Sequence, residues 1–286
     1  MNDALLRKTI GDAMLLFIAL LLLMFFFPWI FAWASGMISL GAFSDFLTRA
    51  LPPQWQRLWG VPISELTTPA GRLALVWVHP LMMIGALTWA IARGSDCVSG
   101  EIGRGSMEML LAQPVRRTSI YATHAAVSIA GSALLATAAL CGTTLGLRTR
   151  EMYADVSWIR FIAPAVNMFA LMVCFGGLAA LASACDSQRW RTIGIMVGVY
   201  VVAVVLTIAG QVSPAWSWLQ YFSVLTPYKP QTMVAHSDMA WQLLGERNGH
   251  AALGLGGCQL VLAGLGAASY LAGAVVFARR EIPAPI

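Results

Sequence analysis

The sequence has little charge and almost no lysine. Of its 286 residues, 11% are charged and 58% are hydrophobic, whereas soluble domains carry about 25% charged residues. This composition predicts a bilayer protein. The two lysines, Lys8 and Lys229, follow an arginine and a tyrosine. A phosphate-binding Walker loop needs Gly-Lys followed by Ser or Thr, so we expect no nucleotide-binding domain and no ATP hydrolysis by this chain itself.

Other chemical signatures are also missing. The five cysteines form no C-x-x-C pair, the four histidines are far apart, and neither H-E-x-x-H nor G-x-S-x-G occurs. These absences argue against a disulfide framework, a metal site and a catalytic residue set. No acidic residue falls in the middle of a hydrophobic run, which argues against a proton-driven carrier. We therefore expect no metal and no cofactor in the chain, and nothing in its net charge of +5 indicates nucleic acid.

Long runs without charge are abundant. Crossing the hydrocarbon takes about 20 residues, and the sequence holds six uncharged runs of sufficient length. Because the backbone must be satisfied inside lipid, these runs predict helices. The fold class is therefore all-α integral membrane, with one domain over residues 1–286. The predicted spans are about 13–35, 70–92, 119–146, 160–184, 192–212 and 251–278.

The segments around the spans predict shorter helices at the membrane surface. Residues 1–13, "MNDALLRKTIGDA", are amphipathic, and we expect an interfacial helix there. Its lipid-facing residues would be Leu5, Leu6, Ile10 and Met14. Residues 36–69 and 213–250 are rich in proline and tryptophan. They predict short interfacial helices, with a re-entrant or surface-lying helix directly after the fifth span.

The basic residues predict an orientation. Placing both termini in the cytoplasm puts ten arginines and lysines inside and eight outside. The inside segments are short and dense, which is what the positive-inside rule counts. We therefore expect a multi-pass membrane protein with both termini cytoplasmic.

The densest mixed-charge segment lies between the second and third spans, at residues 98–124, "VSGEIGRGSMEMLLAQPVRRTSIYATH". Met107, Leu110 and Leu111 fall at helical spacing on one side, and Arg104 and Glu108 stand four residues apart. Gly100, Gly103 and Gly105 permit a tight turn into this helix and Pro114 ends it. A solvated loop with a basic flank is the alternative interpretation.

Three polar residues lie in or near the spans. His79 stands before Pro80 in the second span, His124 near the inner end of the third, and Asn167 in the fourth. Polar groups inside a membrane often mark function, so His79 and Asn167 are candidates for a substrate path. The alternative is that each hydrogen-bonds a neighbouring helix.

"GEIGRGSMEMLLAQPVRR" resembles the cytoplasmic motif of ABC-2 type transporter permeases, in which an acidic residue, a Gly-Thr or Gly-Ser pair and "LLA-x-P-x-x-R" follow the second span. "RKTIGDA" is similar to the basic connecting helix of that family, "LTTPAGRLALVWVHPLMM" to the entry of its second span, and "FARREI" to its ending. The likeness follows nearly the whole chain in order. Ser106 stands where threonine is commoner.

The resemblance implies the permease subunit of an ATP-binding cassette transporter, an exporter in which motion of separate ATPase subunits is converted into substrate translocation. The coupling helix would be residues 102–112. The implied ATPase-coupling residues are Glu101, Gly103, Arg104, Gly105, Met107, Glu108, Leu110, Leu111 and Pro114. A second cytoplasmic contact would comprise Asp186, Arg189, Trp190 and Arg191.

The implied partners are two ABC ATPase subunits, which would carry the ATP and magnesium, and a second permease subunit. Glu101 and Glu108 would pair with arginines of the ATPase, at about 0–1 kcal/mol per exposed pair. Met107, Leu110 and Leu111 would contribute about 1.5–3 kcal/mol each if buried at the contact.

Two other functions remain open. The chain could belong to a mechanotransmission or maturation complex, passing ATP-driven motion to an extracytoplasmic partner without transporting a solute. Alternatively, an intramembrane enzyme could use His79, His124 or Asn167, although no nucleophile, base or metal set can be assembled around them. The sequence does not identify a substrate.

Overall fold

The computed structural model describes residues 3–39, 41–43, 45, 49, 62–112, 116–247 and 250–280. Helices dominate it, with one short hairpin. The long helices are α1 (Asp3–Ser35), α5 (Pro69–Val78), α6 (Pro80–Ser95), α9 (Arg117–Arg148), α10 (Ile162–Cys185), α11 (Arg189–Val212) and α13 (Leu255–Arg279). The short elements are α4 (Ile63–Leu66), the π-turn η2 (Asp96–Gly100), α7 (Glu101–Gly103), α8 (Ser106–Leu111), the 3-10 turns η3 (Glu151–Tyr153), η4 (Trp158–Phe161) and η5 (Pro214–Phe222), α12 (Pro230–Ala235), β1 (Leu244–Arg247) and β2 (His250–Leu253).

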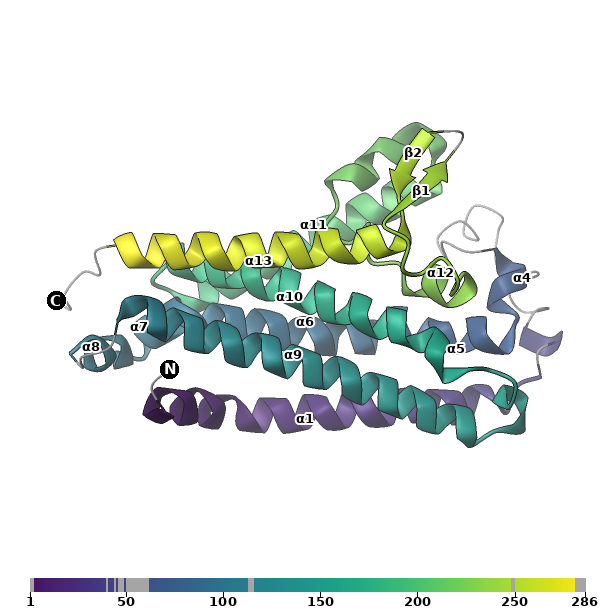
Figure 1. The fold of residues 1–286 in the computed structure, drawn as a ribbon, viewed down its shortest axis with the longest axis horizontal. Helices are drawn as coiled ribbons and strands as arrows, with labels where there is room; N and C mark the ends of the chain where they lie inside the picture. Colours follow the sequence, from purple (N-terminus) through teal and green to yellow (C-terminus); the bar gives the residue numbers. More distant parts are fainter. Residues whose placement is uncertain are drawn as a thin grey trace.

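Five of the described helices, α1, α9, α10, α11 and α13, are long and apolar enough to cross a membrane. The pair α5–α6, continued to Gly103, gives a sixth candidate, bent by 41°. These helices lie over the six sequence ranges expected to span. In Figure 1, α1 begins and α13 ends at the same end of the bundle as α7 and α8, which we call the termini end. Because the first span starts and the last span ends at the same end, the number of crossings is even. The five long helices therefore need the bent pair α5–α6 as a sixth span.

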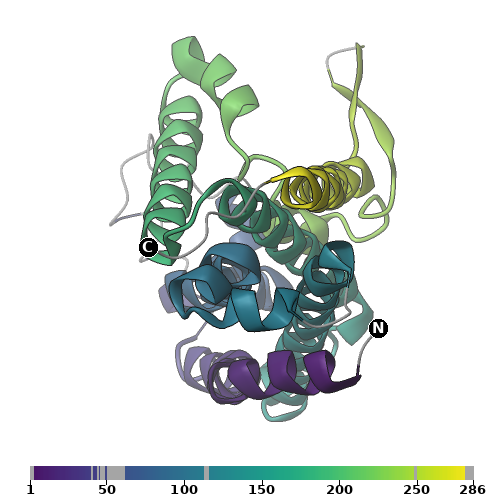
Figure 2. The same ribbon diagram turned by 90° about the vertical axis from the view of Figure 1, so that its left-hand side faces the viewer.

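Helix α10 forms the centre of the bundle. Its apolar window is 72% buried, compared with 17% for α1 and for α11. Figures 1 and 2 show α6, α9 and α13 around it. Glycines permit the close approach of the helices: a Cβ on Gly177 of α10 would lie 2.3 Å from the backbone oxygen of Gly266 in α13. Such small-residue contacts are typical of membrane helix pairs.

The second span is broken at His79. Because a residue before proline avoids the helical region, His79 is extended, with φ −61° and ψ 136°. Its Nδ1 accepts a hydrogen bond from the backbone N–H of Leu81 at 3.2 Å and so caps α6. The ring also packs on Phe27 of α1, with centroids 4.8 Å apart. The bend therefore follows directly from the His-Pro pair.

Arg72 fastens α5 to the end of α1. The residue is only 2% exposed, and its guanidinium donates to the carbonyl oxygens of Ser35 at 2.7 Å, Ile38 at 2.6 Å and Ser39 at 3.2 Å. Its Cζ also lies 4.4 Å from the centroid of the Phe43 ring. Ser35 and Ser39 also accept the backbone N–H groups of Ile38 and Phe43, so the arginine adds bonds from the next helix to the turn that follows α1.

The N-terminal segment corrects one detail of the expected interfacial helix. Helix α1 is continuous from Asp3 to Ser35, and Figure 2 shows its first turns crossing the termini end before the helix turns along the bundle. Ile10 and Met14 are exposed as expected, but Leu5 is buried. Leu5, Thr9 and Ala13 recur every four residues, so this stripe packs on the protein.

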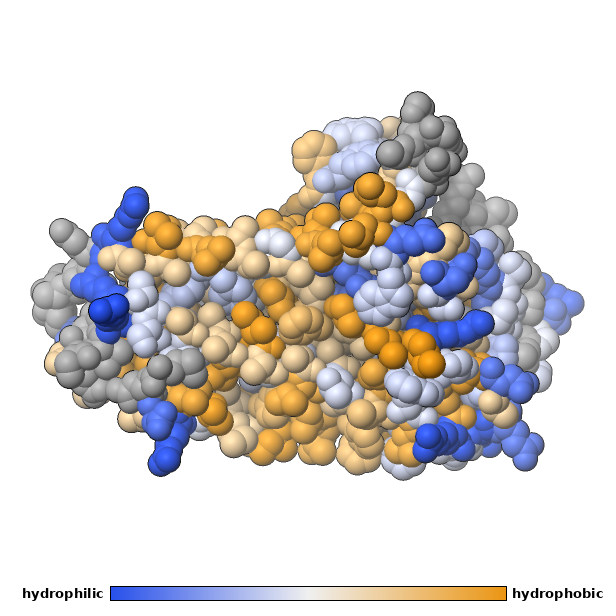
Figure 3. Space-filling view, viewed as in Figure 1, coloured by the Kyte–Doolittle hydropathy of each residue, from blue (hydrophilic) through white to orange (hydrophobic). Residues whose placement is uncertain are grey.

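The opposite end, which we call the far end, carries the short elements. There η5 follows α11 as a short helix, in the place where a surface-lying helix was expected. Strands β1 and β2 form an antiparallel hairpin in which Leu244 pairs with Leu253; this hairpin was not predicted. Figure 3 shows apolar residues over the middle of the bundle and hydrophilic residues toward both ends, as a membrane protein requires.

Candidate functional site

The candidate site is built around two buried carboxylates at the termini end, Asp96 of η2 and Glu101 of α7. Asp96 is 2% exposed and Glu101 is 0% exposed. Both lie where the second span ends, in a π-turn followed by a short helix. A π-turn is rare and frequently marks a functional position in a helix. Charged groups in such surroundings need partners, and both acids have them.

Glu101 joins four segments of the chain. Lys8 of α1 donates to its two carboxylate oxygens at 2.8 and 2.7 Å, and Arg104 donates at 2.9 Å. The hydroxyl of Ser106 also donates to it, and Nε2 of His124 in α9 lies 3.8 Å away. The carboxylate therefore ties the start of α1 to the segment between the second and third spans.

Asp96 collects three guanidinium groups. Arg104 approaches at 2.6 Å, Arg93 of α6 at 3.1 Å and Arg189 of α11 at 3.4 Å. Arg104 therefore bridges Asp96 and Glu101. Burial opposes the charge on Arg104, but the two carboxylates outweigh that effect and raise its pKa. We call Lys8, Arg93, Asp96, Glu101, Arg104 and Arg189 the ionic network.

Hydroxyl groups bind the same turn to α10. Ser183 accepts the backbone N–H groups of Val98 at 3.1 Å and Ser99 at 2.8 Å, and it donates to the carbonyl of Ser95 at 3.0 Å. The hydroxyl of Ser99 lies 3.3 Å from that of Thr192 in α11. One serine of α10 thus bonds three backbone groups at the junction of α6 and the π-turn.

The chain then turns sharply into α8. Gly105 has φ +71°, a left-handed conformation that favours glycine, and helix α8 starts at the next residue. Because of this turn, Arg104 and Glu108 do not share one helix. The expected pair between them is wrong, since Arg104 instead pairs with the two buried acids. Glu108 is exposed.

The orientation of α8 corrects two further expectations. Met107 is 1% exposed and packs with Cys97, Val98, Tyr121 and Phe277 in an apolar cluster of this chain. Glu101 is likewise occupied inside the chain. Neither side chain is exposed for the direct ATPase contact that was expected, because both are buried against other residues of this chain. The outward side carries Glu108, Met109, which is 68% exposed, and Ala112.

The remaining residues of the expected coupling set lie as follows. Gly103 and Gly105 are exposed, the side chain of Arg104 is 41% exposed, and Leu110 is half-buried. The side chain of Leu111 and the whole of Pro114 lie outside the described residues.

The expected second contact, Asp186 to Arg191, divides into an inner and an outer part. Arg189 points to Asp96, as described above, whereas Trp190 is 84% exposed and the Arg191 side chain is 63% exposed. Burial opposes ionisation of Asp186, but the Arg191 guanidinium and the N–H groups of Gln188 and Ser187 outweigh it and lower the pKa of that carboxyl. Trp190 and Arg191 therefore remain available for an external contact.

Arg280, at the end of α13, also binds the turn before α11. Its guanidinium donates to the carbonyl oxygens of Ala184 at 2.9 Å and Asp186 at 2.8 Å, and its own carbonyl accepts from Arg117 of α9 at 2.6 Å. Arg280 thus joins α13 to α9 and to the turn between α10 and α11 at the termini end.

His79 and Asn167, the candidates for a substrate path, both make local contacts. His79 caps α6, as described above. Asn167 is fully buried; its amide donates to the carbonyl of Pro227 at 3.3 Å and accepts the N–H of Lys229 at 3.1 Å. The alternative was that each residue hydrogen-bonds a neighbouring helix. Asn167 instead bonds the segment before α12, and His79 bonds the start of α6 while its ring packs on α1.

Sequence reasoning missed Lys8, Asp96 and Ser183 as members of the site. Lys8 and Asp96 were recognisable as charges at the ends of hydrophobic runs, but their pairing joins residues far apart in the chain. No group of three or more potential metal ligands occurs among the described residues. The arrangement is suited to transmitting displacement between helices, since one short segment contacts α1, α6, α9, α10 and α11.

The comparisons with known proteins agree with this architecture. No curated protein and no solved structure matches the chain. The family described as "ABC-2 family transporter protein" matches residues 5–282, which is nearly the whole chain. On that match, and with its six candidate spans, this chain belongs to the ABC-2 transporter family as a membrane-embedded permease.

Proposed function

We propose that this chain is the permease subunit of an ABC exporter and that it is moved by separate ATPase subunits pressing on α7 and α8. The ionic network is the observation that carries the proposal. It links the short segment after the second span to α1, α6 and α11 through two carboxylates and four cations. A displacement of α7 is therefore passed to several spans at once.

The outward side of α8 supports a direct contact with the ATPase. Glu108 and Met109 are exposed there, and Trp190 is exposed on the neighbouring start of α11. An exposed methionine and tryptophan beside charged residues are typical of protein interfaces. These residues replace Glu101 and Met107 as the contact, while Glu101 acts inside the chain to hold the segment in place.

Two ATPase subunits and a second permease subunit complete the proposed transporter, with ATP and magnesium bound by the ATPases. The face of α11 supports pairing of two permeases. Gly194 and Gly198 form a G-x-x-x-G pattern, and a Cβ at either glycine would meet no atom within 4 Å. In membrane helices this pattern permits close packing of a second helix.

The proposed location is the bacterial plasma membrane, with the termini end in the cytoplasm. The basic residues at that end support this orientation under the positive-inside rule. Arg116, Arg117, Arg279 and Arg280 stand at the ends of α9 and α13, beside the ionic network.

The test is co-purification of the tagged chain with an ABC ATPase from the cells that express it. In the double variant Glu108→Arg with Met109→Asp, we expect loss of co-purified ATPase and of substrate-stimulated ATP hydrolysis. Burying one methionine contributes about 1.5–3 kcal/mol, so binding should weaken about ten- to hundredfold. Glu151→Arg, a charge reversal at the far end, is the matched control. Unchanged binding and hydrolysis in the double variant would overturn the proposal.

A mechanotransmission complex is the second candidate, and the far end favours it. Trp216, Trp218, Tyr221 and Phe222 of η5 are all more than half exposed, and Figure 1 shows the β1–β2 hairpin projecting from the bundle. An extracytoplasmic protein retained by the wild type and lost on Trp218→Ala, without any ATP-dependent flux of solute, would favour this candidate over the exporter.

A further inference from the structure

A cavity of about 730 Å³ opens at the far end, remote from the ionic network. It lies between the last two turns of α9 and the connection to α10. Its wall has an apolar part and a cationic part. The apolar part is formed by Leu140, Leu147, Val156 and Trp158. The cationic part is formed by Arg148 and Arg150. None of the residues proposed for coupling lines it.

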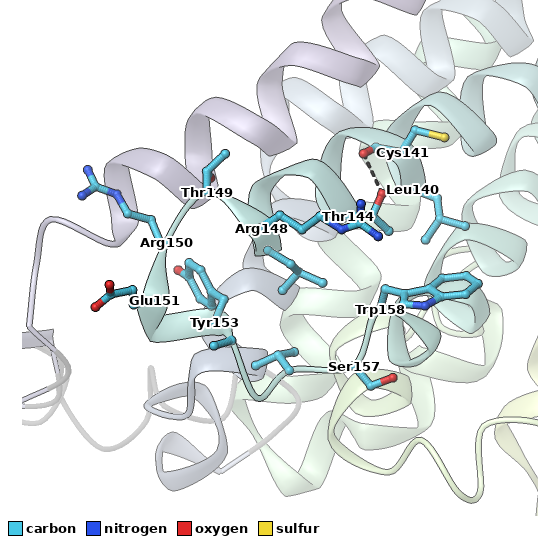
Figure 4. Close-up of a pocket in the computed structure, with 13 residues that line it drawn as sticks. Leu140, Cys141, Thr144, Arg148, Thr149, Arg150, Glu151, Tyr153, Ser157 and Trp158 are labelled. Carbon is cyan, nitrogen blue, oxygen red and sulfur yellow. Dashed lines mark hydrogen bonds between the residues drawn. The ribbon is translucent and has the colours of Figure 1, made fainter.

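Arg148 is the charged group that faces this space. In Figure 4 its guanidinium extends toward Thr144, whereas the charged ends of Arg150 and Glu151 point away from the other lining residues. Arg150 instead stacks over the ring of Trp33, with Cζ 5.3 Å from the centroid. No ion pair among the described residues involves Arg148. The cavity therefore presents an arginine without a carboxylate partner.

The surface below the cavity is apolar and faces outward. Leu134 is 55% exposed and Leu145 is 37% exposed along α9, with the exposed Cys141 between them. From Leu134 to Thr144 the helix rises about 15 Å, at 1.5 Å per residue. That length equals half of a ~30 Å hydrocarbon core, so an acyl chain of one leaflet can lie along this stripe.

Trp158 fixes the depth of the site. Tryptophan is enriched where hydrocarbon meets the headgroups, and Trp158 lines the cavity while 49% exposed. Arg148 ends α9 close to the same level. An arginine guanidinium donates two parallel hydrogen bonds to a phosphate and is the preferred residue for that group. Arg148 is therefore at the level where we expect the phosphate of a lipid.

We propose that this cavity is a binding site for an anionic phospholipid in the leaflet at the far end, with the phosphate at Arg148 and an acyl chain along Leu134, Cys141 and Leu145. Ser157 offers a hydroxyl group for the rest of the headgroup, and the Thr144 hydroxyl, which donates to the Cys141 carbonyl at 2.8 Å, can accept a hydrogen bond from it. We expect a lipid of net negative charge to bind better than a zwitterionic one, because no carboxylate of the described residues neutralises Arg148. The inference depends on the membrane location of the chain and not on its coupling to an ATPase.

The test is native mass spectrometry of the purified full-length chain, titrated with phosphatidylglycerol or with phosphatidylcholine of the same acyl chains. We expect phosphatidylglycerol to be retained several-fold better by the wild type. Arg148→Gln should remove that preference, and Arg148→Lys should keep most of it. Arg160→Gln is the matched control, because Arg160 is exposed in η4 at the same end but does not line the cavity.

Equal retention of the two lipids by the wild type, or undiminished phosphatidylglycerol retention in Arg148→Gln, would overturn the proposal. A second readout locates the lipid. Phosphatidylglycerol with a photoreactive acyl chain should label residues 134–147 in the wild type and label them less in Arg148→Gln. Labelling confined to other helices would equally count against the site. Thermal unfolding of each variant establishes that the bundle is intact.

Discussion

At the scale of single residues, Glu101 has the most consequential environment. Its carboxylate is fully buried, and it is held by Lys8 and Arg104, whose side chains are 36% and 41% exposed. A carboxylate of this kind stabilises the fold only while its cations are present. Its role is therefore to hold the segment after the second span against α1.

We expect Glu101→Gln to lower the thermal stability of the purified chain. Removing one partner of a buried ion pair costs about 3–5 kcal/mol. Because Lys8 and Arg104 are partly exposed to solvent, we expect Glu101→Gln to lower the free energy of unfolding by about 3 kcal/mol or less. Unfolding in detergent, followed by tryptophan fluorescence, measures the effect. Glu108→Gln is the control, because Glu108 is exposed on α8. Equal unfolding temperatures for the two variants would contradict the assignment.

At the scale of elements, α11 and α1 have the least buried apolar windows of the candidate spans, at 17% each, and α11 also carries a glycine pair on its surface. Its exposed side carries Gly194 and Gly198 together with Ile195, Val201 and Val202. In a membrane, such a side faces either lipid or another helix, and two glycines one turn apart favour a helix.

We expect the double variant Gly194→Val with Gly198→Val to reduce pairing of two permeases, because the added side chains keep two α11 backbones apart. Mass photometry of the detergent-solubilised chain would then show more monomer than in the wild type. Gly264→Val on α13 is the control, since that glycine also has no atom within 4 Å of a Cβ. Unaltered dimer in the double variant would mean that the permeases pair through another face.

The sequence predicted the long helices well and the short ones poorly. Uncharged runs are a direct consequence of the cost of charge in hydrocarbon, so each span could be recognised from its own residues. The direction in which α8 turns its side chains could not be predicted from its own residues, because Met107 is buried by residues as distant in the chain as Phe277. The hairpin was recognisable in hindsight from Asn248-Gly249, a strong turn signal in the sequence.

The ionic network likewise could not be predicted from local sequence, because it joins residues that are far apart in the chain. Glu101 was singled out from a local motif, but its partner Lys8 stands 93 residues earlier in the chain. Spacing in the sequence predicts pairs within one helix, such as the expected Arg104–Glu108 pair. The positive φ at Gly105 breaks that helix, and the arginine finds buried acids instead.

At the scale of the whole molecule, the first span begins and the last span ends at the same end of the bundle. Helix α1 begins and α13 ends beside α7 and α8 (Figure 1). This arrangement separates a charged end, which carries the ionic network, from a far end with aromatic turns and a hairpin.

We expect single cysteines at Arg7 and Arg279 to be protected from a membrane-impermeant maleimide in intact cells, and cysteines at Glu151 and Asp238 to be labelled. The physical reason is that the first pair lies at the termini end and the second at the far end. The variants should be made in a chain whose exposed Cys141 and Cys185 are replaced by serine. Labelling of the first pair, with protection of the second, would reverse the proposed orientation.

The break at His79 gives the second span a hinge between α5 and α6. Above it, α5 is clamped to α1 by Arg72; below it, α6 leads into the carboxylates that four cations hold. Proline has no N–H, so the hydrogen bond that would resist pivoting at Pro80 is already absent. If the proposed ATPase subunits press on α7, α6 is therefore the half of this span that moves, while α5 stays anchored to α1.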